Sequence, residues 1–271
     1  MHNVIHGRQA AGDAASEIKE TPLSEYTREE ILKLIEENGG PEGLDLSGKD
    51  LSGIDLSSQA IVNELAKIQK DTNRQPRWAI ASPETGIVCS ANLQKINLVG
   101  ADLQGANLAG ASLQGAWLRY ANLQQANLAG TFMQNAQLQG AQLERAILDG
   151  VDLQGAYLHL ANLREARLLA ANLREAGIQE VNLQGAYLKQ AQLQGANLMY
   201  SHLERADLFD VESLEGAYFY GAFLDDTRIK SEQLGEGIGE EKAKRYGKAR
   251  EAYLALKNNF AQMGYYDETL P

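Results

Sequence analysis

Residues 91–120 read ANLQK INLVG ADLQG ANLAG ASLQG AWLRY, and the same five-residue pattern continues without a break to residue 208. If the central leucine of each unit is position i, the stretch holds 24 units, from Leu93 to Leu208. Position i is leucine in 22 of them, the exceptions being Met133 and Ile178, and position i−2 is alanine in 19. The fold therefore has to bury two apolar side chains in every five residues.

A period of five fits neither regular element. On an α-helix, five residues turn the chain by about 500°, which would spread the leucines over every side. On a flat strand, successive leucines would point to opposite faces. A chain that turns a corner after each unit can point all of them inward, and stacked coils of this kind are typical of repeat proteins. Glycine at position i+2 of ten units suits such corners.

The unit is alanine, then aspartate or asparagine, then leucine, any residue and glycine, and it resembles the repeat of the pentapeptide-repeat family. The resemblance covers residues 44–229 with one interruption. It implies an all-β solenoid, a right-handed quadrilateral β-helix with four units in each coil. The 24 units would form six coils, about 29 Å long at roughly 4.8 Å per coil.

Departures from the pattern divide the chain into five parts. We expect a disordered tail and a short N-terminal capping helix in residues 1–43, first repeats in 44–57, a helix-plus-loop insert in 58–90, the solenoid in 91–234 and a C-terminal helical segment in 235–271. In the first part, Thr27 and Glu30 form a capping box. The apolar stripe that follows is Ile31, Leu34 and Ile35. Such a helix can cover the unpaired edge of the first coil.

The insert interrupts the repeats. Residues 58–70 carry apolar side chains at helical spacing, and a long polar loop containing Trp78 follows. Two interpretations stay open. Either Trp78 anchors the insert against the solenoid, or the insert is a recognition element, because long loops are often functional.

The end of the solenoid is irregular. After Leu208 the register shifts by one residue near residues 211–213, which predicts a bulge. We expect large side chains of the last coil to close the end of the core, namely Tyr218, Phe219, Tyr220 and Phe223.

Residues 240–263 predict a single helix. Its expected apolar stripe is Tyr246, Ala249, Tyr253, Leu256, Phe260 and Met263. The run YLALKNNFAQMGYYDE, residues 253–268, resembles the first helix and turn of a tetratricopeptide-type repeat that lacks its second helix. Such a unit cannot bury its apolar face alone. It therefore packs on the last coil, pairs with another chain to form a homodimer through the C-terminal helix, or continues in a longer protein.

Charge and cysteine content limit the function classes. The net charge of −11 divides into −6 for residues 1–90, −5 for residues 91–229 and zero for residues 230–271. A nucleic-acid-binding protein needs a basic stripe, so no direct nucleic-acid partner is expected. Cys89 is the only cysteine, which excludes an intramolecular disulfide. No secretory signal or membrane-spanning run is present in the sequence, and we expect a cytoplasmic protein without a membrane partner.

The sequence offers no constellation for catalysis. The four histidines lack metal-ligand spacing, and there is no nucleophile elbow, Walker loop or dinucleotide fingerprint. Asp102, Asp152 and Asp207 stand at position i−1, where a carboxylate is expected to accept backbone hydrogen bonds at a corner. We therefore expect no enzyme, no catalytic residue, no cofactor and no metal.

Four units per coil place residues 20 apart on one side of the rod. The sides centred on Leu93 and Leu103 show mostly glutamine and charged residues at i+1, and the side centred on Leu108 shows scattered apolar residues. The side centred on Leu98 differs, since its outward positions cluster the partner-binding candidates Trp117, Arg119, Tyr120, Tyr157, His159, Met199 and Tyr200. The leucines that define the inward register are Leu98, Leu103, Leu138, Leu158 and Leu183.

Aromatic, methionine and arginine side chains are enriched in binding sites. The leading hypothesis is therefore a non-enzymatic scaffold that presents this side to an unidentified protein. The alternative is that the insert or the C-terminal helix covers it. The family resemblance adds a second function, because quinolone-resistance members are acidic rods that mimic DNA and bind gyrase. Here acidic and basic residues alternate, which weighs against mimicry. A third option is a regulatory module of a larger protein.

Overall fold

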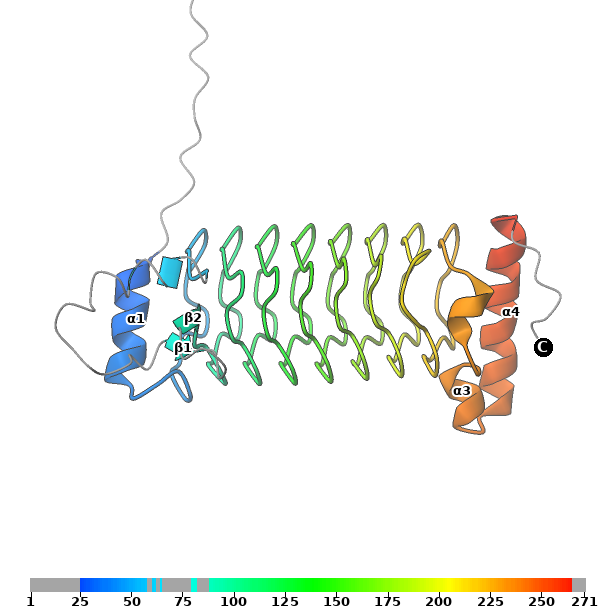
Figure 1. Ribbon diagram of the computed structural model, residues 1–271, viewed down its shortest axis with the longest axis horizontal. Helices are drawn as coiled ribbons and strands as arrows, with labels where there is room; N and C mark the ends of the chain where they lie inside the picture. Colours follow the sequence, from blue (N-terminus) through cyan, green and yellow to red (C-terminus); the bar gives the residue numbers. More distant parts are fainter. Residues whose placement is uncertain (1–24, 58–59, 62–63, 65–78, 82–87, 265–271) are drawn as a thin grey trace, which may run out of the picture.

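The computed structural model describes residues 25–57, 60, 61, 64, 79–81 and 88–264. These residues form a straight rod of stacked coils, with helix α1 (Arg28–Glu37) at one end and helix α4 (Tyr246–Gln262) at the other (Figure 1). Among the described residues, no helix is both long and apolar enough to cross a membrane.

Parallel bridges join the coils at position i−1 of each unit. Asn97 bridges Trp117, which bridges Gln137, and the same step of 20 residues recurs on all four sides. Around each bridge the backbone hydrogen bonds are short, as where the Leu98 N–H donates to the Trp117 carbonyl at 2.8 Å. Twenty residues contain four corners, so each coil has the four sides that the sequence predicts.

The two apolar residues of each unit fill the inside of the rod. The alanines and leucines of residues 91–208 are almost all excluded from solvent. The five leucines of the inward register, Leu98, Leu103, Leu138, Leu158 and Leu183, are each 2% exposed or less. Where a hydroxyl replaces alanine it finds an acceptor inside, since the Thr131 hydroxyl donates to the Leu128 carbonyl at 2.7 Å. The interior is thus a continuous packed column.

The insert enters the first coil. Asp45 pairs with Asn97, which is 52 residues later, and Asp50 and Asp55 pair with the next two sides in the same way. Asn92 supplies the fourth side of this coil. The 58–90 segment therefore leaves the rod after the third side of the first coil and returns at the fourth.

Helix α1 closes this end of the core. Its capping box is present, because the Glu30 N–H donates to the Thr27 hydroxyl at 3.2 Å and the Glu30 carboxylate accepts the Thr27 N–H at 2.8 Å. Ile31, Leu32 and Ile35 are its buried residues. The predicted stripe is thus wider than expected, since Leu34 is half-buried and packs against the core while Leu32 is buried as well.

The described part of the insert is partly a hairpin. Strands β1 (Ala79–Ala81) and β2 (Val88–Ala91) pair antiparallel, whereas the sequence led us to expect a loop there. Antiparallel pairing satisfies backbone groups that a loop next to the core would leave unpaired. Ala60 and Ile61 are helical and buried, in line with a helix at the start of the insert. Trp78 and most of the expected loop lie outside the described residues.

The register shift at the far end lies where predicted. Bridges change from a step of 20 to a step of 21 at Gln192 and Ser213, so one extra residue sits between Leu208 and Ser213. The predicted aromatic closure is mostly wrong, because only Phe219 is buried, while Phe223 is half-exposed and stacks on His202. Phe219 alone occupies an inward position of its unit.

The C-terminal segment is broken where one helix was expected. A short 3₁₀ helix (Ser231–Leu234) leads into helix α3 (Gly239–Lys242), and Lys244 at a φ of 58° separates it from α4. In α4, Ala249, Ala252, Leu256, Asn259 and Phe260 are buried, and α4 lies across the last coil (Figure 1). Tyr246, expected in the stripe, is exposed. No second helix of a tetratricopeptide-type repeat is found in the described residues.

Candidate functional site

The side of the rod centred on Leu98, Leu118, Leu138, Leu158, Ile178 and Leu198 carries the largest exposed side chains; we call its residues 117–120, 137–140, 157–160, 177–180 and 197–200 the aromatic face. Trp117 is 44% exposed and Tyr157 53%, both at position i−1. Tyr120, Leu160 and Tyr200, at position i+2, are 70%, 56% and 45% exposed. None of these five side chains is covered by a described helix.

The three residues at i+2 adopt a backbone conformation that L-residues avoid. The φ angles of Tyr120, Leu160 and Tyr200 are 60°, 61° and 59°. This left-handed region costs a residue with a side chain about 1–2 kcal/mol. The corner geometry requires it at these positions, so each large side chain is held in one direction, outward at the edge of the aromatic face.

Glycines make room for two of these rings. A Cβ atom added to Gly140 would lie 2.6 Å from the ring of Tyr120, one coil earlier, and a Cβ added to Gly221 would clash with the ring of Tyr200. Both tyrosine rings therefore extend along the rod to the glycine of the next coil. The pairing of a tyrosine with a glycine one coil later is a signal that the sequence contains.

The remaining predicted residues share the same surface. Arg119 is exposed, and His159 and Met199 are half-buried. The Nδ1 atom of His159 lies 3.2 Å from the Gln179 carbonyl oxygen, one coil away. All seven residues predicted from the sequence thus lie on one side of the rod, in three of its coils.

Helix α4 touches only the end of this surface. Tyr200 meets Tyr220 edge to face with ring centroids 5.4 Å apart, and Lys248 of α4 lies 4.6 Å from the Tyr220 ring centre. The negative charge of Glu251, then the neighbouring Tyr200, raise the pKa of Tyr220. The expectation that the C-terminal helix might cover the aromatic face is therefore wrong for Trp117 and Tyr157.

Sequence reasoning missed two exposed aromatic residues. Phe132 is 46% exposed on the side centred on Leu93, which we expected to be polar, and Phe223 is 50% exposed. Both stand at position i−1 of their units, whereas the prediction for their two sides was based on position i+1. Inspecting position i−1 of every unit would have found them.

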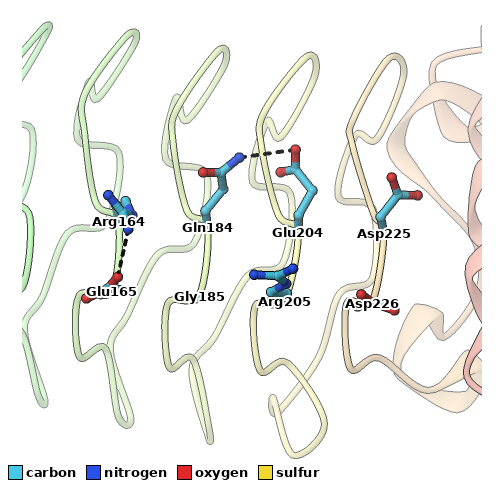
Figure 2. A pocket seen from close by; sticks show the side chains of 8 residues that line it. All are labelled: Arg164, Glu165, Gln184, Gly185, Glu204, Arg205, Asp225 and Asp226. Atoms are coloured by element: carbon cyan, nitrogen blue, oxygen red, sulfur yellow. Dashed lines mark hydrogen bonds and ion pairs between the residues drawn. The ribbon is translucent and has the colours of Figure 1, made fainter.

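A shallow groove of about 530 Å³ lies on the neighbouring side, centred on Leu183 and Leu203 (Figure 2). It is lined by Arg164, Glu165, Gln184, Gly185, Glu204, Arg205, Asp225 and Asp226. Gly185 opens the floor, since it provides no side chain between Glu165 and Arg205 (Figure 2).

Three of the six charged residues of this groove have ion-pair partners, namely Arg164, Glu165 and Glu204. Arg164 lies 3.1 Å from Glu165, whose other oxygen accepts a hydrogen bond from Arg145 at 2.7 Å. Burial raises the pKa of Glu204, but hydrogen bonds from His202, from its own backbone and from Gln184 outweigh this and leave the pKa lowered. Ion pairs and hydrogen bonds therefore hold the part of the groove around Arg164, Glu165 and Glu204.

Among the described residues, no group of three or more histidine, cysteine, aspartate or glutamate side chains could hold a metal ion. Asp102, Asp152 and Asp207 play the predicted part at corners, as where the Asp102 carboxylate accepts the Gln104 N–H at 3.0 Å.

Comparison with known families identifies the repeats. A family described as pentapeptide repeats, with 8 copies, matches residues 90–125, 118–155, 148–177 and 178–212. No curated protein matches the chain at a significant level.

Several solved structures share the repeat. A pentapeptide repeat protein, Rfr23, from the cyanobacterium Cyanothece 51142 is 28% identical, covering 59% of this chain and 91% of its own, with a TM-score of 0.28. HetL, a pentapeptide repeat protein involved in heterocyst differentiation regulation in the cyanobacterium Nostoc sp. strain PCC 7120, is 26% identical over 75% and 94%, with a TM-score of 0.21. A trypsin-treated form of QnrB1, a plasmid-mediated fluoroquinolone resistance protein, is 16% identical over 57% and 87%, with a TM-score of 0.23.

Proposed function

We propose that the chain is a non-enzymatic scaffold whose aromatic face binds another protein, on the premise that its residues 90–212 match the pentapeptide-repeat family. The observation that carries the proposal is the exposure of Trp117, Tyr120, Tyr157, Leu160 and Tyr200 on one side of a rigid rod. Single exposed apolar residues are normal on protein surfaces. Five on one side, held by corners of fixed geometry in alternate coils, form a cluster of exposed apolar side chains of the kind that marks interaction sites.

The rigidity of the rod favours binding. Each of these side chains extends from a unit whose alanine and leucine are buried, so the backbone beneath it is fixed by hydrogen bonds to both neighbouring coils. A surface that is already ordered loses little conformational entropy on association. Tryptophan and tyrosine are also the side chains that most often dominate binding energy.

The packed interior supports the non-enzymatic part of the proposal. Leucine and alanine fill the rod, and the groove described above is shallow and partly lined by paired charges. A site for a small substrate is usually a concave pocket with a few convergent polar groups, and the described residues lack one.

The test is capture of the partner from a native extract by crosslinking, with wild type beside the double variant Trp117→Ala/Tyr157→Ala. Loss of either hot-spot aromatic typically costs about 2 kcal/mol or more, so the double variant should lose a partner that wild type retains. Phe132→Ala is the matched control, because Phe132 is equally exposed on another side. A partner that binds the double variant and wild type equally would contradict the proposal.

A further inference from the structure

The apolar side chains of the aromatic face repeat with a fixed period along the rod. Tyr120, Leu160 and Tyr200 occupy the same position of their units and follow one another by 40 residues, which is two coils. Trp117 and Tyr157 form a second row with the same separation. At a spacing of about 4.8 Å between neighbouring strands, two coils rise about 9.6 Å. The face therefore presents apolar ridges about 9.6 Å apart.

This period matches one peptide conformation better than the others. A polyproline II helix has three residues per turn and rises about 9.3 Å per turn, so its shift against the ridges is about 0.3 Å per repeat. Seven residues of α-helix rise about 10.5 Å, a shift three times larger. In an extended strand, residues on one face are about 6.8 Å apart, and neither this distance nor its double fits.

The chemistry between the ridges suits the same conformation. Polyproline II has no internal hydrogen bonds, so its carbonyl groups need donors from a partner. The coils between the ridges carry half-buried Gln137, Gln139 and Gln179, whose amide groups can donate. Gly177 stands at position i−1 in the coil between those of Tyr157 and Tyr200. It has no side chain, so it leaves a gap on the face between these two tyrosines. Aromatic side chains are what other domains use to recognise proline-rich segments in this conformation.

Two charged residues give the face a direction. Arg119 and Glu180 are exposed, and neither side chain has an ion pair or hydrogen bond among the described residues. Their charges are therefore available to a partner, whereas Arg145 and Arg167 are paired with Glu165 and Asp149. Arg119 and Glu180 stand three coils apart, about 14 Å. Four or five residues of polyproline II cover about the same length.

We propose that the aromatic face binds a proline-rich segment of the partner protein in the polyproline II conformation. Prolines at every third position lie against successive ridges. An acidic residue near one end of the segment faces Arg119, and a basic residue near the other end faces Glu180. This inference rests on the proposed function, since it names the chemistry of the partner that the scaffold binds.

The test uses two synthetic peptides of identical composition. One has proline at every third position between an acidic and a basic end, and the other has the same prolines at every second position. Binding to the full chain is measured by titration calorimetry. The first peptide should bind at least tenfold more tightly than the second. Tyr157→Ala should weaken it at least tenfold, while Phe132→Ala should leave it unchanged.

The charges allow a second, independent measurement. Arg119→Glu should weaken binding, and a peptide whose acidic end is changed to lysine should restore it to this variant. Equal binding of the two peptides, or no binding of either, would overturn the inference. If the partner is still captured in a manner that depends on Trp117 and Tyr157, the scaffold proposal survives and only its polyproline partner is wrong. If that dependence is also absent, both proposals fail.

Discussion

Ala170 shows what the corners of the rod demand of a single residue. It stands at position i+2 with a φ of 55°, and Lys95, Gln125 and Glu175 adopt the same left-handed conformation. Glycine occupies this position in ten units of the 91–208 stretch because it reaches positive φ without a steric cost. The other units accept the strain, since the bridges on both sides of the corner fix the backbone.

Replacing Ala170 by glycine should therefore stabilise the protein. The left-handed conformation costs alanine about 1–2 kcal/mol in the folded state. Glycine removes this cost, but it also stabilises the unfolded chain by about 0.4–1 kcal/mol because it increases the conformational entropy of that chain. We expect a net gain of roughly 0.5 kcal/mol, read from the midpoint of urea unfolding.

Ala129→Gly is the matched control, because Ala129 lies outside the left-handed region. Without strain to relieve, this variant should lose about 0.5–1 kcal/mol. If both variants shift the midpoint in the same direction, the corner strain is not what sets the stability of Ala170→Gly.

A substitution at a buried leucine should destabilise the rod instead. Leu138, in the middle of the rod, is 1% exposed, and burying such a side chain contributes about 1.5–3 kcal/mol. Leu138→Asp should lose this and add the larger cost of an unpaired charge. The variant should unfold locally at its coils, seen as loss of amide protection in hydrogen exchange.

Leu160→Asp serves as the control, since Leu160 is exposed at a corner where aspartate tolerates positive φ. Its amide protection should match that of wild type. Full protection in Leu138→Asp would mean that the inward register is wrong.

At the scale of elements, the open edge of the last coil requires a cap. In every earlier coil, the N–H groups at i and i+2 donate to carbonyls of the next coil. At Phe219 no further coil follows, and the Glu240 carboxylate of α3 accepts the N–H groups of Phe219 at 2.6 Å and Tyr220 at 2.5 Å. Asn259 of α4 in turn donates to the Thr227 carbonyl at 2.9 Å. Helices α3 and α4 thus supply the hydrogen-bonding groups of a missing coil.

Removing the Glu240 carboxylate should destabilise the C-terminal end of the rod. Glu240→Ala leaves two buried N–H groups without an acceptor, and each such group costs about 1–3 kcal/mol. We expect a loss of about 2 kcal/mol or more, measured by urea unfolding. Glu240→Gln keeps an acceptor oxygen and should lose less. Glu236→Ala, an exposed change on the same connection, should stay close to wild type; an equal loss there would argue against the cap.

The same carboxyl gives stability a specific pH dependence. Burial raises the pKa of Glu240 above its ordinary value of 4.5, although the N–H groups of Tyr220 and Phe219 act to lower it. The folded state therefore holds this proton more tightly than the unfolded chain. The contribution of Glu240 to the free energy of unfolding is therefore fully present below the ordinary pKa of the carboxyl. It is lost as the pH rises through the raised pKa.

Urea unfolding of wild type and Glu240→Gln from about pH 4 to about pH 8 isolates this contribution. Other carboxyls, such as Glu165, have lowered pKa values and act in the opposite direction in both proteins. The stability of wild type relative to the variant should therefore fall as the pH rises. A difference that stays constant with pH would show that Glu240 ionises equally in the folded and unfolded states.

At the scale of the whole molecule, the rod is closed at both ends and its surface charge is interleaved. Arg145 and Arg164 alternate with Glu144 and Glu165 through contacts of 2.7–3.7 Å. Helix α4 uses its apolar side against the last coil, so a dimer through α4 would have to use the opposite side, around Leu254, which is 58% exposed.

A DNA-like surface needs a continuous row of negative charge, because duplex DNA carries one charge per about 1.7 Å. The paired charges on the rod do not form one. We therefore expect the purified protein neither to inhibit nor to protect gyrase in a DNA supercoiling assay at micromolar concentration. Inhibition that is lost in Glu165→Lys would instead favour the mimic and count against the scaffold.

Local repetition made much of this predictable. The period of five, the inward register of leucines such as Leu138, the bulge before Ser213 and the capping box at Thr27 all follow from residues close together in sequence, and the structure agrees. The side on which Trp117, Tyr157 and Tyr200 meet also followed, because a step of 20 residues fixes the neighbours. Their role in binding stays a prediction.

By itself, the sequence determined the coil, the core and the surface on which the aromatic residues gather, because each depends on a pattern repeated every five residues. Only the tertiary structure decided what lies at the ends. The entry of the insert between the third and fourth sides, the burial of Leu32 beside the predicted stripe, the break before α4 and the cap by Glu240 depend on contacts between segments far apart in sequence. No local period encodes them, since a chain end is closed by whichever side chains reach its unpaired backbone groups.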